Sequence, residues 1–149
     1  MLFGHVAIAV LQHRYLKADL APAVAGSVFP DVVDKTLCQV LRLTSSGRMA
    51  AHTFAGLAVS TAVVELVWGR RTARSWALGY LGHLLGDADG FMPWLHPFVC
   101  YDFPPDSSGL LEVWRRLLTD PARMRLELLL SVWAVCAWVR SSLRRCRGN

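Results

Sequence analysis

Apolar residues recur every three or four positions along most of the chain, a spacing typical of amphipathic α-helices. Strict alternation of apolar and polar residues, which a half-buried strand requires, is hard to find in the sequence. Glycine, proline and serine interrupt the helical pattern at intervals. We therefore predict an all-α protein, a single helical bundle with helices over 3–17, 19–28, 31–43, 48–68, 72–85, 110–118 and 123–141.

Several residues mark the expected helix ends. Pro30 should end the second helix, because proline lacks the backbone N–H that a helix interior needs. The Ser-Ser-Gly sequence at 45–47 offers an N-cap for the long apolar helix, and Gly69 is its expected C-cap. The longest irregular stretch runs from about 86 to 105. Its aromatic residues either cover a site, insert into lipid or pack onto the bundle; they are Phe91, Trp94, Phe98, Tyr101 and Phe103.

The chain of 149 residues is long enough for one domain with its own core. Its composition is 54% hydrophobic and 18% charged, with a mean hydropathy of +0.34, which is more apolar than an ordinary soluble domain. No segment reaches the roughly 20 uninterrupted apolar residues of a clear membrane span. The segment 123–141, flanked by arginines on both sides, is short for a perpendicular span and has no orientation that the charge rule fixes. We predict a helical core over 1–105 and C-terminal helices over 106–149 that associate with a membrane.

The net charge of +5 comes from arginines collected in short runs. Such runs beside apolar helices suit anionic lipid head groups, at about 1 kcal/mol for each basic side chain near the surface. Solvated helix ends are the simpler interpretation, and phosphates of a nucleic acid would fit the same charges. The apolar composition disfavours a soluble nucleic-acid binder. The runs are Arg70, Arg71 and Arg74; Arg115 and Arg116; Arg123 and Arg125; and Arg140, Arg144, Arg145 and Arg147.

The four cysteines show no CxxC or CxxH spacing, so neither a thiolate zinc site nor a disulfide framework is predicted. A reducing compartment is the default for such a chain. The N-terminus lacks a charged start and a clear cleavage site, so it does not read as a signal peptide. We therefore expect His5 to remain in the mature protein.

Histidines and aspartates occur within apolar surroundings, where burying a charge is costly unless it is paired or bound to a metal. His83 and Asp87 are four positions apart, so on a helix both side chains reach one face and one ion. Taken alone, this spacing is common by chance, and a hydrogen-bonded structural pair is its simpler interpretation. His52 lies near the start of the long apolar helix, one turn after Arg48, and a core histidine bonded to a carbonyl is its simpler interpretation.

Two aspartates and one further histidine complete the candidates. Asp31 and Asp34 follow Pro30 at a predicted helix start, where acidic residues also act as caps. His5 has apolar neighbours on both sides and is otherwise a lone core histidine. Imidazoles and carboxylates from four separate helices form a donor set suited to zinc or a similar divalent ion.

The segments GHVAIAV, VFPDVVDK, RMAAHTF and GYLGHLLGDADGFMPWLHP resemble the inner-membrane-associated metal-dependent hydrolases, a family also labelled LexA-binding. The resemblance covers about the first two thirds of the chain and implies the cytoplasmic (inner) membrane as its location. The ligand order is also similar to that of the helical zinc-dependent phospholipase C fold, shared by some single-strand nucleases. These similarities imply a phospholipase C-like core in which Asp87 is a candidate bridge between two ions. The implied metal ligands are His5, Asp31, His52, His83 and Asp87.

The chain departs from both patterns at several positions. Around His52 the membrane family commonly has a second histidine, a threonine and a serine, where this sequence has Gly47, Ala51 and Thr53. The phospholipase C pattern continues with further His and Glu ligands, whereas His96 is the only candidate for such a ligand that we identify after Asp87. One or two ions are therefore expected rather than three.

A zinc ion at such a site would supply a metal-bound hydroxide for hydrolysis of a phosphoester or another ester. Asp34 or Asp89 would orient ligands or relay a proton, and Arg48 would neutralise charge developing on the substrate. The expected partners are membrane lipids, a small-molecule or lipid substrate and a possible protein partner. The competing hypothesis is a non-catalytic membrane bundle in which these residues bind a structural metal or a regulatory protein partner.

Overall fold

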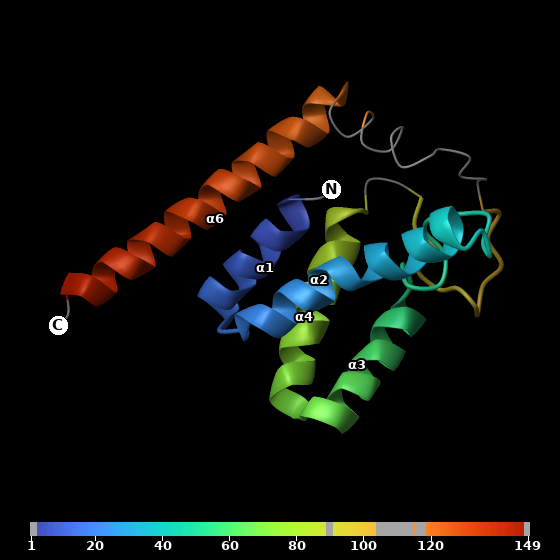
Figure 1. The fold of residues 1–149 in the computed structure, drawn as a ribbon, viewed down its shortest axis with the longest axis horizontal. Helices are drawn as coiled ribbons and strands as arrows, with labels where there is room; N and C mark the ends of the chain where they lie inside the picture. Colours follow the sequence, from blue (N-terminus) through green and yellow to red (C-terminus); the bar gives the residue numbers. More distant parts are fainter. Residues whose placement is uncertain (1–2, 89–90, 104–114, 116–118, 148–149) are drawn as a thin grey trace.

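The computed structural model describes residues 3–88, 91–103, 115 and 119–147. Five helices pack as a bundle, and these ranges contain no strand, so the predicted all-α fold is confirmed (Figure 1). Of the predicted helix over 110–118, only Arg115 falls among the described residues. In chain order the elements are α1 (Phe3–Leu16), α2 (Leu20–Lys35), the π-helical segment η1 (Thr36–Val40), α3 (Phe54–Trp68), α4 (Arg70–Gly86) and α6 (Pro121–Arg147).

Helix α2 passes through Pro30 without ending, so the predicted break at this proline is wrong. A proline in a helix interior costs about 3 kcal/mol because it removes one backbone hydrogen bond and crowds the preceding turn. Pro30 is buried within a helix that packs closely on α4, and tertiary packing of this kind overrides local propensity. As a result, α2 and η1 form one continuous helical segment that ends at Val40.

Helix α3 begins at Phe54 rather than at about Arg48, so the predicted start of the long apolar helix is also wrong. Its N-cap is Thr53, whose hydroxyl accepts a hydrogen bond from the Gly56 N–H at 2.8 Å. The preceding segment, 41–53, is irregular because a buried carboxylate binds its backbone, as described below. Arg48 and His52 therefore do not share a helix face.

Helices α2, α4 and α1 approach one another through small residues. A Cβ atom on Gly79 would overlap the Ala23 carbonyl of α2, and one on Gly26 would overlap the Trp76 carbonyl of α4. Gly82 of α4 similarly faces the side chains of Ile8 and Gln12 on α1. This close packing brings the end of α4 against the middle of α2. A buried cluster of Tyr80, Leu84 and Met92 fills the space beside α3, with Phe29, Leu57, Trp76 and Trp94 around it.

Helix α6 lies along one side of the bundle and packs on α1, with the two helices running in the same direction (Figure 1). The Phe3 N–H donates to Glu127 Oε2 at 3.4 Å near the start of both helices, and the His13 and Trp138 rings meet further along, 6.2 Å apart. The helix continues to Arg147, beyond the predicted end at 141. Its apolar part, Met124–Leu143, has 20 residues, about 30 Å of helix, which is long enough to cross a membrane.

Candidate metal centre

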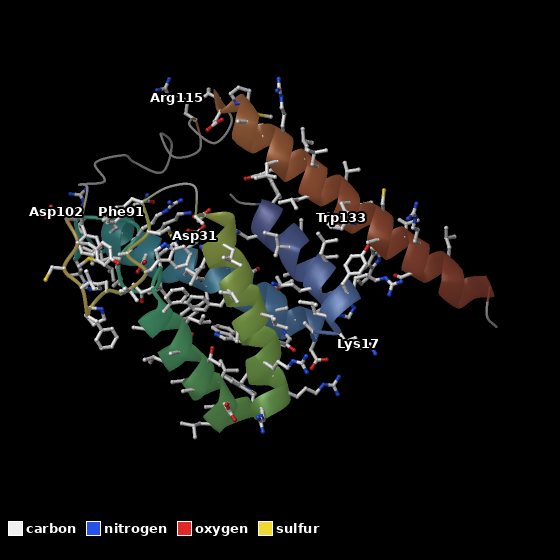
Figure 2. All side chains as sticks on the ribbon, turned by 180° about the vertical axis from the view of Figure 1, so that it is seen from behind. Lys17, Asp31, Phe91, Asp102, Arg115 and Trp133 are labelled. Carbon is white, nitrogen blue, oxygen red and sulfur yellow. The ribbon has the colours of Figure 1, made fainter. Side chains whose placement is uncertain are left out.

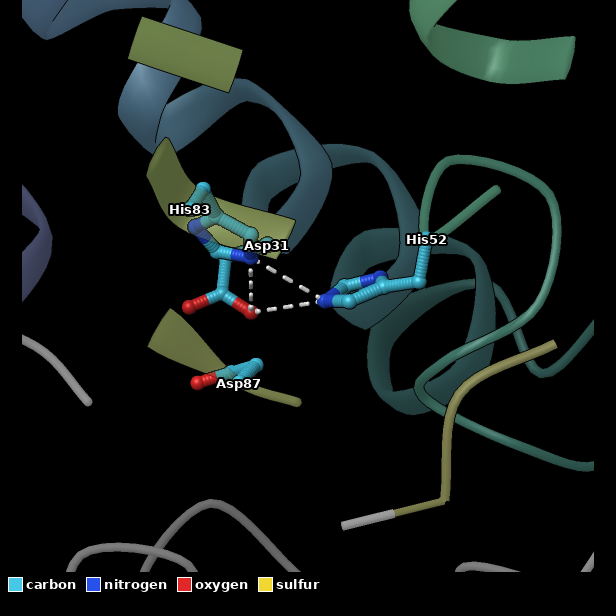
Figure 3. Close-up of side chains that lie close together, drawn as sticks. All are labelled: Asp31, His52, His83 and Asp87. Carbon is cyan, nitrogen blue, oxygen red and sulfur yellow. Dashed lines mark hydrogen bonds and ion pairs between the residues drawn. The ribbon is translucent and has the colours of Figure 1, made fainter. Parts of the chain in front are cut away.

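Four of the predicted ligands, namely Asp31, His52, His83 and Asp87, lie together at one end of the bundle. Each offers one donor atom, and these four atoms all lie within 4.8 Å of one another (Figure 3). Asp31 comes from α2, His52 from the irregular segment 41–53, and His83 and Asp87 from the last turn and the C-cap of α4. Three of the four residues are buried, whereas Asp31 is partly exposed, with 14% of its side chain accessible. Asp31 is therefore the member of the group with the most contact to solvent.

Both histidines of this group are held by their Nδ1 atoms. His83 Nδ1 lies 2.7 Å from the carbonyl oxygen of Ser27, which can only accept, so this nitrogen has the proton. His52 Nδ1 lies 2.8 Å from Oδ2 of Asp34 and donates to that carboxylate in the same way. In a metal-binding histidine, a hydrogen bond donated by the ring nitrogen that does not bind the ion fixes the tautomer and the ring orientation.

The Nε2 atoms of His52 and His83 consequently face each other, 3.2 Å apart. In two neutral rings with protonated Nδ1 atoms, both facing nitrogens present lone pairs, and the lone pairs repel unless a proton or a cation lies between them. Asp31 Oδ1 adds negative charge at 3.6 Å from His52 Nε2 and 3.9 Å from His83 Nε2. Two nitrogens and two carboxylates in this arrangement suit a divalent cation, so the residues fit a metal ion.

Asp34 binds the segment that presents His52. Its buried carboxylate accepts hydrogen bonds from the backbone N–H groups of Met49, Ala51 and His52, at 2.8 to 3.1 Å, as well as from the His52 ring. These bonds replace the helical pattern that the sequence predicted for this segment. Asp34 therefore positions His52, and it is not one of the four residues of the group.

The charges around the group shift the pKa values of its members in opposite directions. Burial would raise the pKa of Asp31, but interactions with His52, Lys35 and His83 outweigh it and hold this pKa well below its usual range. Burial likewise would lower the pKa of His52, but the Asp31 and Asp34 carboxylates raise it above the usual value. In His83, burial, reinforced by repulsion from His5, lowers the pKa to about 3. His83 is therefore neutral near pH 7, whereas His52 attracts a proton or another cation.

Two basic side chains pair with the carboxylates of the group from its rim. Arg48 Nη2 lies 2.7 Å from Asp87 Oδ2, and Lys35 Nζ lies 2.6 Å from Asp31 Oδ2. Both cations are partly exposed. Arg48 is among the residues predicted from the sequence, whereas Lys35 is not, although the spacing of four between Asp31 and Lys35 in one helix is a usable signal.

The fifth predicted ligand, His5, lies beside the group but not within it. Its ring stacks on His83 with centroids 3.9 Å apart, and its Nε2 is 3.3 Å from Asp87 Oδ1. This approach is close enough for an ion pair but lacks hydrogen-bond geometry, since neither ring nitrogen has a hydrogen-bond partner among the described residues. His5 is thus a buried histidine on the α1 side of Asp87. Whether it is a ligand stays a prediction.

The remaining sequence candidates lie at the edge of the group or elsewhere. Asp89 lies outside the described residues, so its predicted role stays a prediction. His96 packs its ring against Phe103, with centroids 5.3 Å apart, and is not a member of the group. In the aromatic loop, Trp94 packs on Phe54 at the start of α3, whereas Phe98 is 84% exposed. The loop thus combines residues packed on the bundle with others open to solvent or lipid.

The family model for the YdjM inner membrane protein matches residues 1–144 of the chain. The chain belongs to the YdjM inner membrane protein family. No curated protein and no solved structure gives a significant match. Membership in the YdjM family confirms the predicted location in the inner membrane, and α6 is an apolar helix of the length that such a location requires.

Among the described residues, this YdjM-family chain has one group of histidines and acids that could hold a metal ion. The group joins residues that the sequence separates by up to 56 positions. The YdjM family name itself states neither a metal nor a reaction.

Proposed function

We propose that this YdjM-family protein is a membrane-bound hydrolase that uses one or two divalent metal ions, zinc being favoured, to cleave a phosphoester or another ester. The observation that supports this most strongly is the pair of Nε2 atoms of His52 and His83, which face each other at 3.2 Å with two carboxylates beside them. Nitrogen and carboxylate donors together suit zinc better than magnesium or calcium, which prefer oxygen ligands alone.

A divalent ion at this position would lower the pKa of a coordinated water and polarise an oxygen of the substrate. Asp31, His52, His83 and Asp87 would hold the ion. Asp34 would keep the His52 ring in the tautomer that leaves Nε2 free to bind, and the Ser27 carbonyl would do the same for His83. Asp89 remains the sequence-based candidate for relaying a proton.

The rim cations favour an anionic substrate such as a phosphoester. Asp31, Asp34 and Asp87 contribute three negative charges, and Lys35 and Arg48 contribute two positive charges. Two further positive charges from a divalent ion would make this set of groups net positive. Lys35 and Arg48 are also partly exposed, so they could contact a phosphate at the rim and neutralise charge as it develops there.

Metal quantification combined with a substrate screen tests this proposal. Detergent-purified protein should contain a stoichiometric divalent metal, and it should cleave generic phosphodiester or ester substrates in a manner that a chelator abolishes. His83→Ala should lose both properties. His96→Ala is the matched control, because this histidine lies outside the group, and it should retain the metal.

The burial of His52 and His83 also agrees with a second candidate function, a structural metal in a bundle that binds a regulatory protein. Bound metal without turnover on any substrate of the screen, together with loss of folding in His83→Ala, would favour this alternative. Absence of metal from wild-type protein purified without chelator and after zinc reconstitution would contradict both.

A further inference from the structure

The bundle has two ends of different charge. The metal group, as we name Asp31, His52, His83 and Asp87, lies at only one of them. The site end comprises the start of α1, the ends of α2 and α4, segments 41–53 and 91–103, and the start of α6. The opposite end, here named the basic end, comprises the α1–α2 turn, the α3–α4 turn and the part of α6 near Arg140. Lys17 and Asp31 mark these opposite ends in Figure 2.

Contacts between side chains and backbone hold the parts of the basic end together. Arg71 at the start of α4 pairs with Asp19 in the α1–α2 turn at 2.8 Å, and Ser75 accepts a hydrogen bond from the backbone N–H of the same aspartate. The His13 and Trp138 rings join the end of α1 to α6. The α1–α2 turn and the end of α1 therefore connect the start of α4 on one side with α6 on the other.

The charge difference between the ends is large for the described side chains. The basic end has two acidic residues, Asp19 and Glu65, and six exposed basic residues, which are Arg14, Lys17, Arg70, Arg71, Arg74 and Arg140. The site end has six acidic residues, which are Asp31, Asp34, Asp87, Asp102, Asp120 and Glu127. They outnumber its five basic residues, Lys35, Arg42, Arg48, Arg115 and Arg125. Two of those five, Lys35 and Arg48, pair with carboxylates of the metal group.

The two ends coincide with the two ends of the apolar part of α6. Glu127, near its start, contacts Phe3, which is two residues from His5 of the site end. Arg140, near its finish, follows Trp138, which contacts the end of α1. Helix α6 therefore leads from the level of the metal group to the level of the basic end, across about 30 Å of apolar helix.

Apolar side chains accompany the arginines of the basic end. Leu66 is 87% exposed and Trp68 is 65% exposed at the end of α3, directly before Arg70, and Leu16 is exposed beside Lys17. A tryptophan and aliphatic residues beside arginines are typical of a surface at the boundary between lipid and water. The site end has no comparable surplus of positive charge among its described residues.

We propose that the basic end contacts the anionic lipid head groups of the cytoplasmic leaflet, and that the metal group consequently opens on the opposite, outer face of the inner membrane. Anionic head groups add about 1 kcal/mol for each basic residue near the surface, and acidic residues offset this attraction at the site end far more than at the basic end. The sequence left this orientation open because both flanks of α6 are basic. Spatial grouping of the α1–α2 and α3–α4 turns with the C-terminal flank gives the two ends of α6 different net charges, a difference that the order of residues along the chain does not show. This inference holds whether or not the metal group is catalytic.

Cysteine labelling in spheroplasts tests the orientation. Native Cys100 is exposed in segment 91–103 at the site end, and Leu16→Cys places a thiol at the basic end. A membrane-impermeant maleimide, with the labelled peptides identified by mass spectrometry, should modify Cys100 from outside. It should modify the introduced thiol only after the membrane is opened. The reverse pattern, or labelling of both thiols from one side, would overturn the proposal.

The wild-type chain provides a check that needs no substitution, because Cys100 can be scored alone and Cys136 lies within the apolar part of α6. Cys136 should resist the reagent from both sides until detergent is added. If Cys136 reacts in intact spheroplasts, then α6 does not cross the bilayer and the proposed orientation is wrong.

Charge neutralisation tests the role of the basic end itself. Arg70→Gln with Arg74→Gln should reduce outside labelling of Cys100 and produce a population labelled only from the cytoplasmic side. The matched control is Arg42→Gln with Arg125→Gln, which removes two exposed arginines from the site end and should leave the labelling pattern unchanged. Equal effects of the two pairs would contradict a specific role for the basic end.

Discussion

The metal group, which is a candidate metal site, joins two regions that position its side chains by different means. Asp31 and His83 lie on α2 and α4, whose backbones approach so closely that a single added Cβ at Gly79 would overlap the neighbouring helix. His52 lies in the irregular segment 41–53, whose shape depends on hydrogen bonds to one carboxylate, that of Asp34. The part of the group on α2 and α4, here named the helical half, is thus positioned by steric fit distributed over many residues. The part in segment 41–53, here named the loop half, is positioned by one side chain, that of Asp34. A single substitution should therefore disrupt the loop half more easily than the helical half.

Removal of the Asp34 carboxylate should give the largest effect. Asp34→Ala leaves buried N–H groups of segment 41–53 and the His52 ring without their acceptor, and breaking a buried charged pair costs about 3 to 5 kcal/mol. We expect a loss of that order in the free energy of unfolding, together with loss of bound metal. Chemical denaturation in detergent and metal analysis measure the two effects.

Asp102→Asn is the control for this substitution, because Asp102 is an exposed carboxylate at the same end of the bundle. It should leave stability and metal content unchanged. If Asp34→Ala behaves like this control, the loop half does not depend on Asp34.

Interference with the helical half should give the next largest effect. Gly79→Ala forces α2 and α4 apart, and overpacking of this kind costs about 1 to 3 kcal/mol. Because the strain is spread along two helices, we expect a lower melting temperature with metal affinity weakened rather than abolished. Thermal unfolding and zinc titration would show this. Complete loss of metal with unchanged stability would mean that the helical half is not positioned by steric fit.

The two histidines should give the metal-free protein opposite pH dependences. Folding raises the pKa of His52, so its contribution to stability is present below about pH 6.5 and is lost as the pH rises through the raised pKa. Folding lowers the pKa of His83 to about 3, so its contribution is present above about pH 6.5 and is lost as the pH falls toward 3. Melting temperatures measured against pH in the presence of chelator should therefore lose their alkaline decline in His52→Gln and the part of their acidic decline above about pH 4 in His83→Gln. The decline at lower pH should remain in both variants, because the pKa values of Asp31 and Asp34 are also lowered. Identical pH profiles for the two variants would contradict the distinction between the halves.

Lys35 at the rim should give the smallest effect on stability. Its pair with Asp31 is partly exposed, and exposed ion pairs contribute about 0 to 1 kcal/mol. Lys35→Met should therefore leave the melting temperature nearly unchanged. It should weaken competitive inhibition of the proposed ester hydrolysis by inorganic phosphate, and Lys35→Arg is the control that preserves the charge. Unchanged phosphate inhibition in Lys35→Met would remove this lysine from substrate binding.

The helical half of the site was predictable from sequence, whereas the loop half was predictable only in its residue identities. His83 and Asp87 are four positions apart in an apolar helix, and that spacing alone places both side chains toward one point. The backbone around His52 was predicted as helix because its residues suit one. Periodicity does not reveal that Asp34, fifteen positions before Met49, binds the N–H groups of this segment.

The remaining differences also arise from tertiary contacts. Pro30 was expected to end a helix, yet α2 continues through it because packing against α4 outweighs the local cost. The Ser27 carbonyl that orients His83 has no side-chain signature in the sequence, since any residue provides the same oxygen. Local spacing therefore predicted which residues meet, and the hydrogen bonds that orient them required the structure.

X-ray absorption spectroscopy at the zinc edge on the reconstituted, detergent-solubilised protein is the most direct test of the claim that a cation binds between His52 and His83. The first coordination shell should contain two imidazole nitrogens at about 2.0 to 2.1 Å with carboxylate oxygens beside them, and His83→Ala should reduce the imidazole count to one. A wild-type spectrum without imidazole scattering, or one that His83→Ala leaves unchanged, would contradict it.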